Sequence, residues 1–134
     1  MAVTFPFKEE KSAIFGKIHR PIALVYIKHQ KENLWRKVDM IVDSGADYTL
    51  LPRFLASALG VSLSRDCMVV DTNGVGGRSK VYLLRKKLLV KIGDYERSIP
   101  VGFLSSDYIP PLLGRKEFFE TFKVTFEKFI VSFE

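Results

Sequence analysis

The sequence predicts a mostly β fold in a single domain, and three observations lead to this prediction. Short apolar runs rich in Val, Ile, Leu, Phe and Tyr alternate with Gly, Pro, Asp or Asn, as in strands separated by turns. A length of 134 residues suits one domain with a substantial core. Hydrophobic residues make up 47% and charged residues 27% of the chain, which is typical of a folded globular protein. We therefore expect residues 1–134 to form one folded unit.

The strands that we expect cover residues 22–28, 37–42, 67–71, 79–92 and 97–103. The last two should form a hairpin across residues 92–95, because Gly93 supplies the positive φ that a tight turn needs. A second hairpin is expected near the end, where residues 123–127 and 129–133 alternate apolar with polar side chains.

Two short helices are also expected. The first follows Pro52 and ends at Gly60, which can adopt a left-handed cap conformation. Its apolar residues at helical spacing should cover the core, and they are Phe54, Leu55, Ala58 and Leu59. The second covers residues 116–122 and should bury Phe118, Phe119 and Phe122.

Composition argues against several classes of protein. No apolar run approaches the roughly 20 residues that cross a bilayer, and the first residues lack the apolar stretch of a signal peptide, so we expect a cytoplasmic protein without a membrane partner. The single Cys67 excludes an internal disulfide. His19 and His29 have no supporting ligand pattern around them, so neither a metal nor another cofactor is expected.

The net charge of +6 raises the alternative of nucleic-acid binding. The densest basic run, residues 85–87, lies inside an expected strand, and the other basic residues are interspersed with acidic or apolar ones. We therefore interpret that run as a solvated face of a sheet and expect no nucleic-acid partner.

The most informative stretch of the sequence surrounds Asp43. An apolar strand runs into a loop of small residues that presents this one carboxylate. In that loop Ser44 can hold the chain by a hydrogen bond, Gly45 permits close approach of a second backbone, and Ala46 leaves room for a ligand. Asp-Ser-Gly alone is more typical of an ordinary turn than of a catalytic loop.

Two further features give this loop its weight. A glycine-rich segment, Gly74-Val75-Gly76-Gly77, lies between expected strands and would form the tip of a mobile hairpin. Farther along, the apolar residues 111–113 are followed directly by Gly114 and Arg115.

These three features, in this order and spacing, resemble the retropepsin family of dimeric aspartic peptidases and its bacterial and archaeal single-domain relatives. The resemblance spans residues 22–126 and implies a closed or orthogonal barrel-like half-domain that forms a two-fold homodimer. It assigns Asp43, Ser44 and Gly45 to catalysis, with the Ser44 hydroxyl bracing the two loops across the dimer. It assigns substrate binding to Ala46, Asp47, Gly74, Val75, Gly76 and Gly77. It also implies that Arg115 and Gly114 give structural support to the loop, with Arg115 pairing with Asp47.

The implied activity is that of an endopeptidase, in which two carboxylates share one water molecule and one proton. Because the chain carries one such motif, two copies of Asp43 would have to meet across a symmetry axis. The expected partners are a second copy and an extended peptide or protein substrate. The alternative is a catalytically silent module that keeps the dimeric fold and binds peptides without cleaving them.

Overall fold

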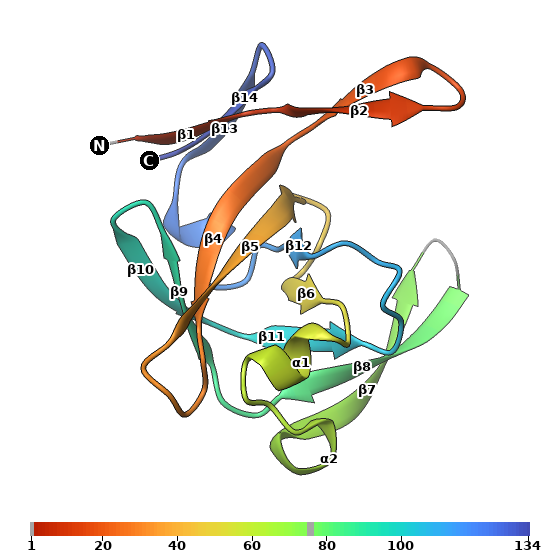
Figure 1. Ribbon diagram of the computed structural model, residues 1–134, viewed down its shortest axis with the longest axis vertical. Coiled ribbons are helices and arrows are strands. Elements are labelled where there is room, and N and C mark those ends of the chain that lie inside the picture. The colour runs from red at the N-terminus through yellow and green to blue at the C-terminus, as the bar shows by residue number, and fades with distance from the viewer. Residues whose placement is uncertain (1, 75–76) are drawn as a thin grey trace.

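The computed structural model describes residues 2–74 and 77–134, and strands make up most of it (Figure 1). The strands are β1 (Val3–Pro6), β2 (Lys8–Ser12), β3 (Gly16–Arg20), β4 (Ile22–Lys28), β5 (Trp35–Val42), β6 (Thr49–Leu51), β7 (Cys67–Gly74), β8 (Gly77–Leu84), β9 (Leu88–Ile92), β10 (Tyr95–Ile99), β11 (Val101–Leu104), β12 (Leu112–Leu113), β13 (Val124–Glu127) and β14 (Ile130–Phe133). The helical turns are α1 (Leu55–Ala58), α2 (Leu63–Asp66) and the 3-10 turn η1 (Phe119–Thr121). The predicted mostly β fold is confirmed.

The largest sheet has nine strands in the order β10-β9-β4-β5-β12-β6-β11-β8-β7. Its neighbours are antiparallel except for two parallel pairs, β5 with β12 and β6 with β11. The short strand β12 therefore lies between β5 and β6 and brings the segment near residue 112 beside the segments near residues 41 and 50. The pairings of the described strands leave β10 and β7 as the two edges, so of the closed or orthogonal barrel-like half-domain that we expected, the closed form is not seen in these pairings.

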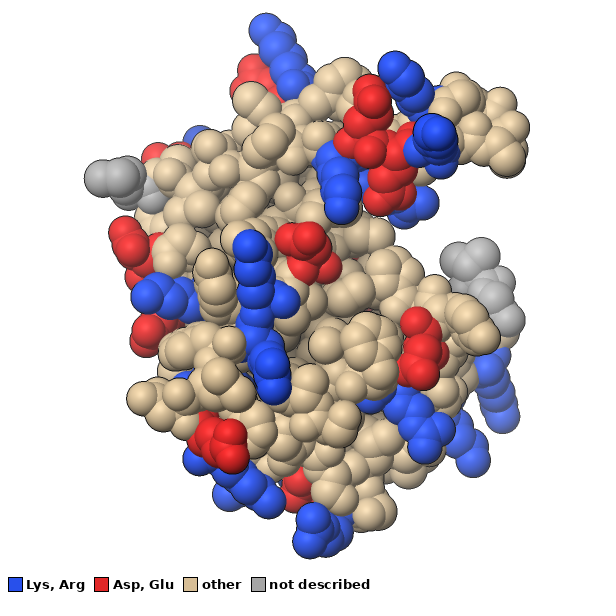
Figure 2. All heavy atoms as spheres, in the orientation of Figure 1, with Lys and Arg blue, Asp and Glu red and all other residues tan. Residues whose placement is uncertain are grey.

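Two smaller sheets lie outside this one. Strands β1, β14 and β13 pair with one another and bring the two ends of the chain together. Strands β2 and β3 pair only with each other, and their hairpin projects away from the body of the molecule (Figures 1 and 2). Its tip exposes two large apolar side chains, with 83% of Ile14 and 75% of Phe15 accessible to solvent.

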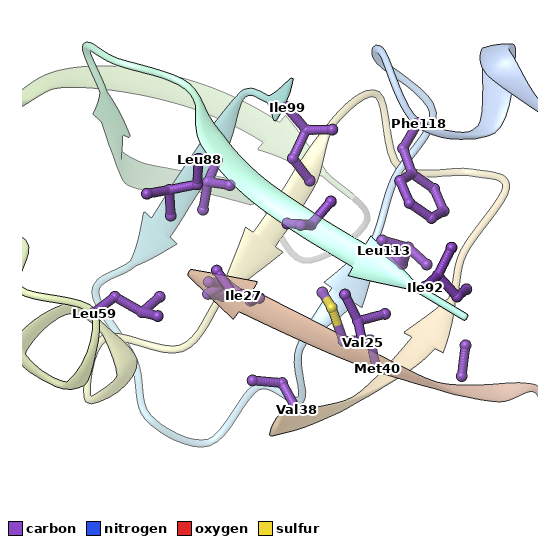
Figure 3. Packing of buried hydrophobic residues seen from close by; sticks show 14 of the residues in the cluster. Val25, Ile27, Val38, Met40, Leu59, Leu88, Ile92, Ile99, Leu113 and Phe118 are labelled. Carbon is purple, nitrogen blue, oxygen red and sulfur yellow. The ribbon is translucent and has the colours of Figure 1, made fainter. Parts of the chain in front are cut away.

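The core follows from the alternation of side chains along the strands of the large sheet. Every second residue of β4 is buried, including Val25 and Ile27, and so is every second residue of β5 from Val38 onward. Figure 3 shows these side chains packing with Leu113 and Phe118, which come from the far end of the sequence. Full burial of one such side chain stabilises a fold by about 1.5–3 kcal/mol. This packing fixes the direction of β5, and therefore the position of the residue that follows it.

Two expected strands are interrupted. The expected strand 79–92 divides into β8 and β9, and the basic residues 85–87 form the bend between them. The reason is that the Arg85 N–H donates to the Asp66 carbonyl (3.0 Å), outside the strand ladder. The expected strand 97–103 breaks at Pro100, which has no N–H to offer a neighbouring strand. Both predicted hairpins, β9–β10 and β13–β14, are confirmed.

Both expected helices are shorter than predicted. The first is a single turn, α1, in which Ala56 is buried. Of the residues predicted to cover the core, Leu59 is fully buried and Leu55 packs against the core, whereas Phe54 is 56% exposed. It ends as expected at Gly60, whose φ is +73°. The second is the turn η1, because Glu117 has a left-handed φ of 58° and interrupts a longer helix.

Candidate active site

Asp43 is the first residue after β5, and both of its neighbouring segments hold it in place. The Val42 N–H donates to the Pro21 carbonyl (2.8 Å), and the Asp43 N–H donates to the Leu113 carbonyl (3.0 Å). The second bond comes from the parallel strand β12, so it ties the end of β5 to a segment that lies about seventy positions later in the chain. Asp43 is half-buried as a result, and its carboxylate emerges at the end of the sheet.

The loop after Asp43 is a tight turn that this aspartate itself organises. The Gly45 N–H donates to Asp43 Oδ1 (2.9 Å), and the Ala46 N–H donates to the Asp43 carbonyl (3.2 Å). An aspartate that accepts from the backbone two residues later is a common turn former. A Cβ at position 45 would lie only 3.2 Å from the same Oδ1. Glycine at 45 therefore makes room for the Asp43 carboxylate, and the role that we expected for it, close approach of a second backbone, stays a prediction.

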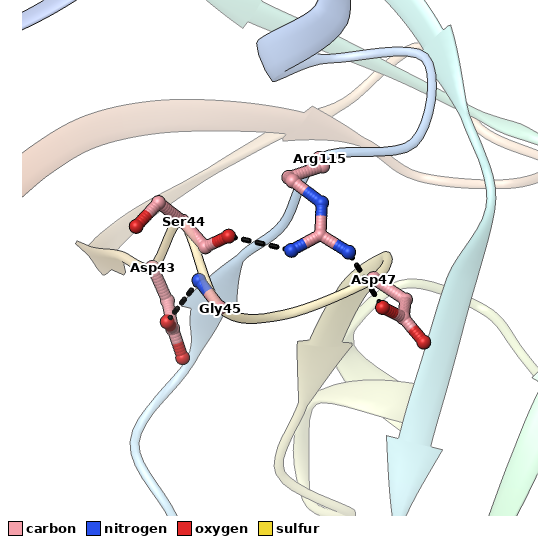
Figure 4. A network of polar contacts seen from close by, with 5 residues as sticks. All are labelled: Asp43, Ser44, Gly45, Asp47 and Arg115. Carbon is pink, nitrogen blue, oxygen red and sulfur yellow. Dashed lines mark hydrogen bonds and ion pairs between the residues drawn. The ribbon is translucent and has the colours of Figure 1, made fainter.

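Arg115 braces the loop from the side opposite to the aspartate. Its guanidinium donates one hydrogen bond to the Ser44 carbonyl and another to Asp47 Oδ1, each 2.6 Å long. In Figure 4 the guanidinium lies between these two groups, and the Asp43 carboxylate points away from it. The expected ion pair between Arg115 and Asp47 is therefore present. The guanidinium binds the loop beside Asp43 and affects the Asp43 carboxylate only by fixing the conformation of that loop.

The backbone beside Arg115 follows the same loop. The Arg115 N–H donates to the Ala46 carbonyl (3.0 Å), and the Lys116 N–H donates to the Asp47 carbonyl (2.8 Å). The Asp47 side chain is 83% exposed and that of Arg115 is 46% exposed. An ion pair in such a solvated position contributes about 0–1 kcal/mol to stability. The forked contact therefore defines loop geometry more than it stabilises the fold.

Gly114 and Thr49 form a buried contact beneath the loop that sequence reasoning did not assign. The Gly114 N–H donates to Thr49 Oγ1 (3.2 Å), and Thr49 is fully buried. A Cβ on Gly114 would collide with the backbone of Tyr48, so only glycine lets these two segments approach so closely. The available signal was a lone threonine at the start of an apolar run, which indicates a buried polar group with a partner.

Tyr48 is a second residue of the loop that sequence reasoning missed. Burial raises the pKa of its hydroxyl above the ordinary value, and the negative charge of Asp47 raises it further. Its ring lies against Gly102 of β11, where a Cβ would contact it. Tyr48 therefore fastens the end of the loop to the large sheet.

Gly74 and Gly77, the two described residues of the glycine-rich segment, pair with each other in the β7–β8 hairpin. The two strands pair from Cys67 with Leu84 to Gly74 with Gly77, and Gly77 has a φ of +104°. Two of the predicted substrate-binding residues, Val75 and Gly76, lie outside the described residues. Strand β8 pairs with β11, which pairs with β6 at the end of the Asp43 loop. The hairpin and the loop are thus joined through three neighbouring strands.

Within residues 2–74 and 77–134, no group of three or more His, Cys, Asp or Glu side chains is arranged to hold a metal ion. No helix in the same part of the chain has the length and apolar character to cross a membrane.

A mostly β fold that presents one carboxylate on an Asp-Ser-Gly turn places this chain in the class of proteins with an aspartic-peptidase fold. Comparison with known families agrees, since residues 31–116 match the family model of aspartyl proteases. The chain belongs to the aspartyl protease family. No curated protein matches the sequence. The crystal structure of a retropepsin-like aspartic protease from Rickettsia conorii is similar, with a TM-score of 0.69, 20% identity and 98% of each chain covered. That likeness shows that the fold is retropepsin-like.

Proposed function

We propose that this protein is an aspartic endopeptidase that acts as a homodimer, with Asp43 of each subunit as its catalytic carboxylate. The observation that carries the proposal is that, in a chain of the aspartyl protease family, the Asp43 carboxylate is oriented by the backbone of its own loop and forms no ion pair in the described chain. The Asp43 side chain emerges at the end of β5 with one oxygen oriented by the Gly45 N–H at 2.9 Å. The guanidinium of Arg115 binds the flanking loop and leaves this carboxylate free of an ion pair within the described chain.

In the proposed reaction a water molecule lies between two Asp43 carboxylates. The ionised carboxylate accepts a proton from the water, which attacks the peptide carbonyl, and the protonated carboxyl donates a hydrogen bond to the carbonyl oxygen. Two carboxylates so close cannot both ionise easily, and the pair therefore shares one proton and titrates as a unit. The reaction requires no metal or other cofactor.

A second copy is needed because one chain supplies one Asp-Ser-Gly loop. Residues that lie next to a two-fold axis meet their own copies, so a symmetric dimer can bring two Asp43 side chains together. Two features of the chain support this arrangement. Ser44 is exposed, and its hydroxyl makes no hydrogen bond within the described residues, so it is free to brace a partner loop. The apolar tip of the β2–β3 hairpin offers a surface that a second copy can cover.

The proposed substrate is an extended segment of a peptide or protein. It would lie between the Asp43 loop and the β7–β8 hairpin, with its backbone paired as an added strand and its side chains in alternating pockets. Ala46 and Asp47 would line the loop side, and Gly74 to Gly77 would cover the substrate as a flap.

The test is cleavage of a peptide library between about pH 4 and pH 7, the range in which a carboxylate pair can share its proton. We expect Asp43→Asn to lower the rate by about 10²–10⁴-fold, because it removes a general acid and base. Asp39→Asn is the matched control, since Asp39 is an exposed aspartate of β5 outside the loop. Sedimentation of the wild-type protein should show a dimer wherever cleavage is seen. Equal cleavage by the two variants, or full activity of a monomer, would refute the proposal.

The alternative is a module of the same fold that binds peptides without cleaving them. It predicts a peptide that wild type and Asp43→Asn bind equally well, with no turnover by either protein. The two outcomes are distinguished by mass spectrometry of the peptide after incubation with each protein.

A further inference from the structure

Two adjoining hollows lie at the end of β5 that is remote from Asp43. One has a volume of about 390 Å³ and is bounded by the turn between β4 and β5 and by residues 86–89. The other has a volume of about 310 Å³ and is bounded by the same turn, α2 and residues 85–86. They share Gln30, Lys31 and Lys86. Strand β5 has eight residues, which at about 3.3 Å each separates these hollows from Asp43 by about 25 Å.

The lining of these hollows is strongly basic. Two acidic residues, Glu32 and Asp66, face six cationic ones, and the cationic residues are Lys28, Lys31, Arg65, Arg85, Lys86 and Lys87. At the lower end of the view in Figure 2, where Figure 1 places α2 and the β4–β5 turn, Lys and Arg side chains project from the surface. The basic run 85–87, which we interpreted as a solvated face of a sheet, lies instead in the bend between β8 and β9 beside basic residues from other segments. The fold gathers them from three separate segments.

Within the described residues, most of these cations form no ion pair. Lys87 pairs with Glu117 at 2.6 Å. The carboxylate of Asp66 accepts hydrogen bonds from the Ser62 N–H (2.7 Å) and the Gln30 amide (3.3 Å). The other five cationic side chains form no ion pair within the part of the chain that the structure describes. Clustered cations repel one another, and a bound anion would relieve that repulsion.

The walls of the hollows are held by hydrogen bonds within the protein. The Gln30 N–H donates to the Leu59 carbonyl (2.8 Å), which ties the β4–β5 turn to the segment after α1. The Gln30 amide reaches Asp66 in α2, and the Arg85 N–H donates to the carbonyl of the same Asp66 (3.0 Å). All three walls are therefore fixed relative to one another before any ligand arrives, which lowers the entropic cost of binding.

The lining favours an acidic peptide over other anions. Cationic side chains spread over two hollows exceed what one phosphate or carboxylate can contact. Single-stranded nucleic acids gain much of their affinity by stacking bases on aromatic rings, and the lining of both hollows has no Phe, Tyr or Trp. The carboxylate of Glu32 and the amide oxygen of Asn33 can accept hydrogen bonds from peptide N–H groups, which a phosphodiester backbone lacks.

We propose that the two hollows form one binding site for an acidic segment of a peptide or protein. Where that segment belongs to a substrate, the site would hold the substrate about 25 Å from Asp43 and raise its local concentration at the catalytic loop. This consequence rests on the proposed peptidase function, whereas binding of the acidic segment does not.

The experiment measures binding by the Asp43→Asn protein, so that no cleavage interferes. The probes are a fluorescently labelled peptide rich in Glu and a matched peptide with Gln in place of each Glu, and the readout is fluorescence anisotropy. We expect the Glu peptide to bind more tightly than the Gln peptide. Its affinity should fall as the salt concentration rises from about 0.1 M to about 1 M, because the Debye screening length falls from about 10 Å to about 3 Å. Because a proton-transfer step is not involved, failure of the proposed peptidase activity would leave this result unchanged.

The variants identify the site. Lys31→Glu with Lys86→Glu should weaken binding of the Glu peptide by about tenfold or more, because each reversal turns an attraction into a repulsion. Lys31→Gln with Lys86→Gln should give a smaller loss in the same direction, which provides a second reading if the reversals disturb folding. Lys8→Glu with Lys11→Glu changes the net charge equally on β2 and should leave the affinity near wild type. Equal losses of affinity in the double variant at Lys31 and Lys86 and in the double variant at Lys8 and Lys11 would overturn the proposal. Displacement of the labelled peptide by an oligonucleotide at a lower concentration than by unlabelled peptide would also overturn it.

Discussion

The two ends of β5 use positive charge in opposite ways. Beyond its last residue, the guanidinium of Arg115 is engaged by the Ser44 carbonyl and by Asp47, both at 2.6 Å. At the opposite end of the strand, side chains such as Lys31 and Lys86 surround two hollows, and these two side chains form no ion pair within the described chain. A paired cation fixes the shape of a loop, whereas an unpaired cluster remains available to an outside anion. Substitutions at the two ends should therefore have different effects.

The largest effect is expected at Gly114. Gly114→Ala places a Cβ against the Tyr48 backbone, which cannot move aside as a flexible side chain can. We expect the free energy of unfolding in urea to fall by about 3 kcal/mol, the upper part of the range for overpacked sites. Gly16→Ala is the control, because a Cβ there meets nothing within 4 Å and pays only for its φ of +75°, about 1 kcal/mol. Equal losses of stability in the two variants would show that the loop accommodates a larger side chain at position 114 than its geometry indicates.

Thr49→Val tests the hydrogen bond below the same loop. Valine keeps the shape of threonine but leaves the Gly114 N–H buried without its acceptor. An unsatisfied buried donor costs about 1–3 kcal/mol, which thermal or urea unfolding would detect. Thr4→Val on the exposed face of β1 should change stability by less than about 0.5 kcal/mol. A neutral Thr49→Val would mean that the loop obtains no support from this bond.

Arg115→Met and Lys86→Met compare the two ends directly. Each removes one positive charge and keeps a long side chain. Arg115→Met should lower stability by about 1 kcal/mol and peptide cleavage by about 10²-fold, because the Asp43 loop loses its brace and its geometry. Lys86→Met should change stability by less than about 0.5 kcal/mol. Destabilisation by Lys86→Met as large as that by Arg115→Met would contradict the contrast between paired and unpaired charge.

The smallest effect concerns the one engaged carboxylate at the basic end. The pKa of Asp66 is lowered, first by the hydrogen bond from the Ser62 N–H and further by the Gln30 amide. A lowered pKa in the folded state gives stability that is present above the ordinary value of 3.8 and lost as pH falls through the folded value. The difference in melting temperature between wild type and Asp66→Asn should therefore shrink below about pH 4. A difference in melting temperature that stays constant through this pH range would show that protonation of Asp66 does not contribute to the loss of stability in acid.

Local chemistry explains which parts of the fold the sequence could predict. The alternation over β4 and the turn at Gly93 depend on neighbouring residues, and the strand and the hairpin were found where predicted. Strand β6 was missed because its three residues gain their partners from β11 and β12, which lie far along the chain. Strand β2 was missed because its charged side chains do not alternate with apolar ones. Its pairing with β3 includes the contact of Glu10 with Arg20 at 2.7 Å.

The amino-acid sequence by itself determined the carboxylate of Asp43 and the small residues of its turn, because hydrogen bonds between near neighbours shape that loop. The tertiary structure decided which charges meet. Arg115 reaches Asp47 across 68 positions only because β12 inserts between β5 and β6. Lys31, Arg65 and Lys86 surround the same hollows because the β4–β5 turn, α2 and the bend after β8 converge there. Side-chain patterns act over a few residues, whereas strand pairing sets the distances between remote charges.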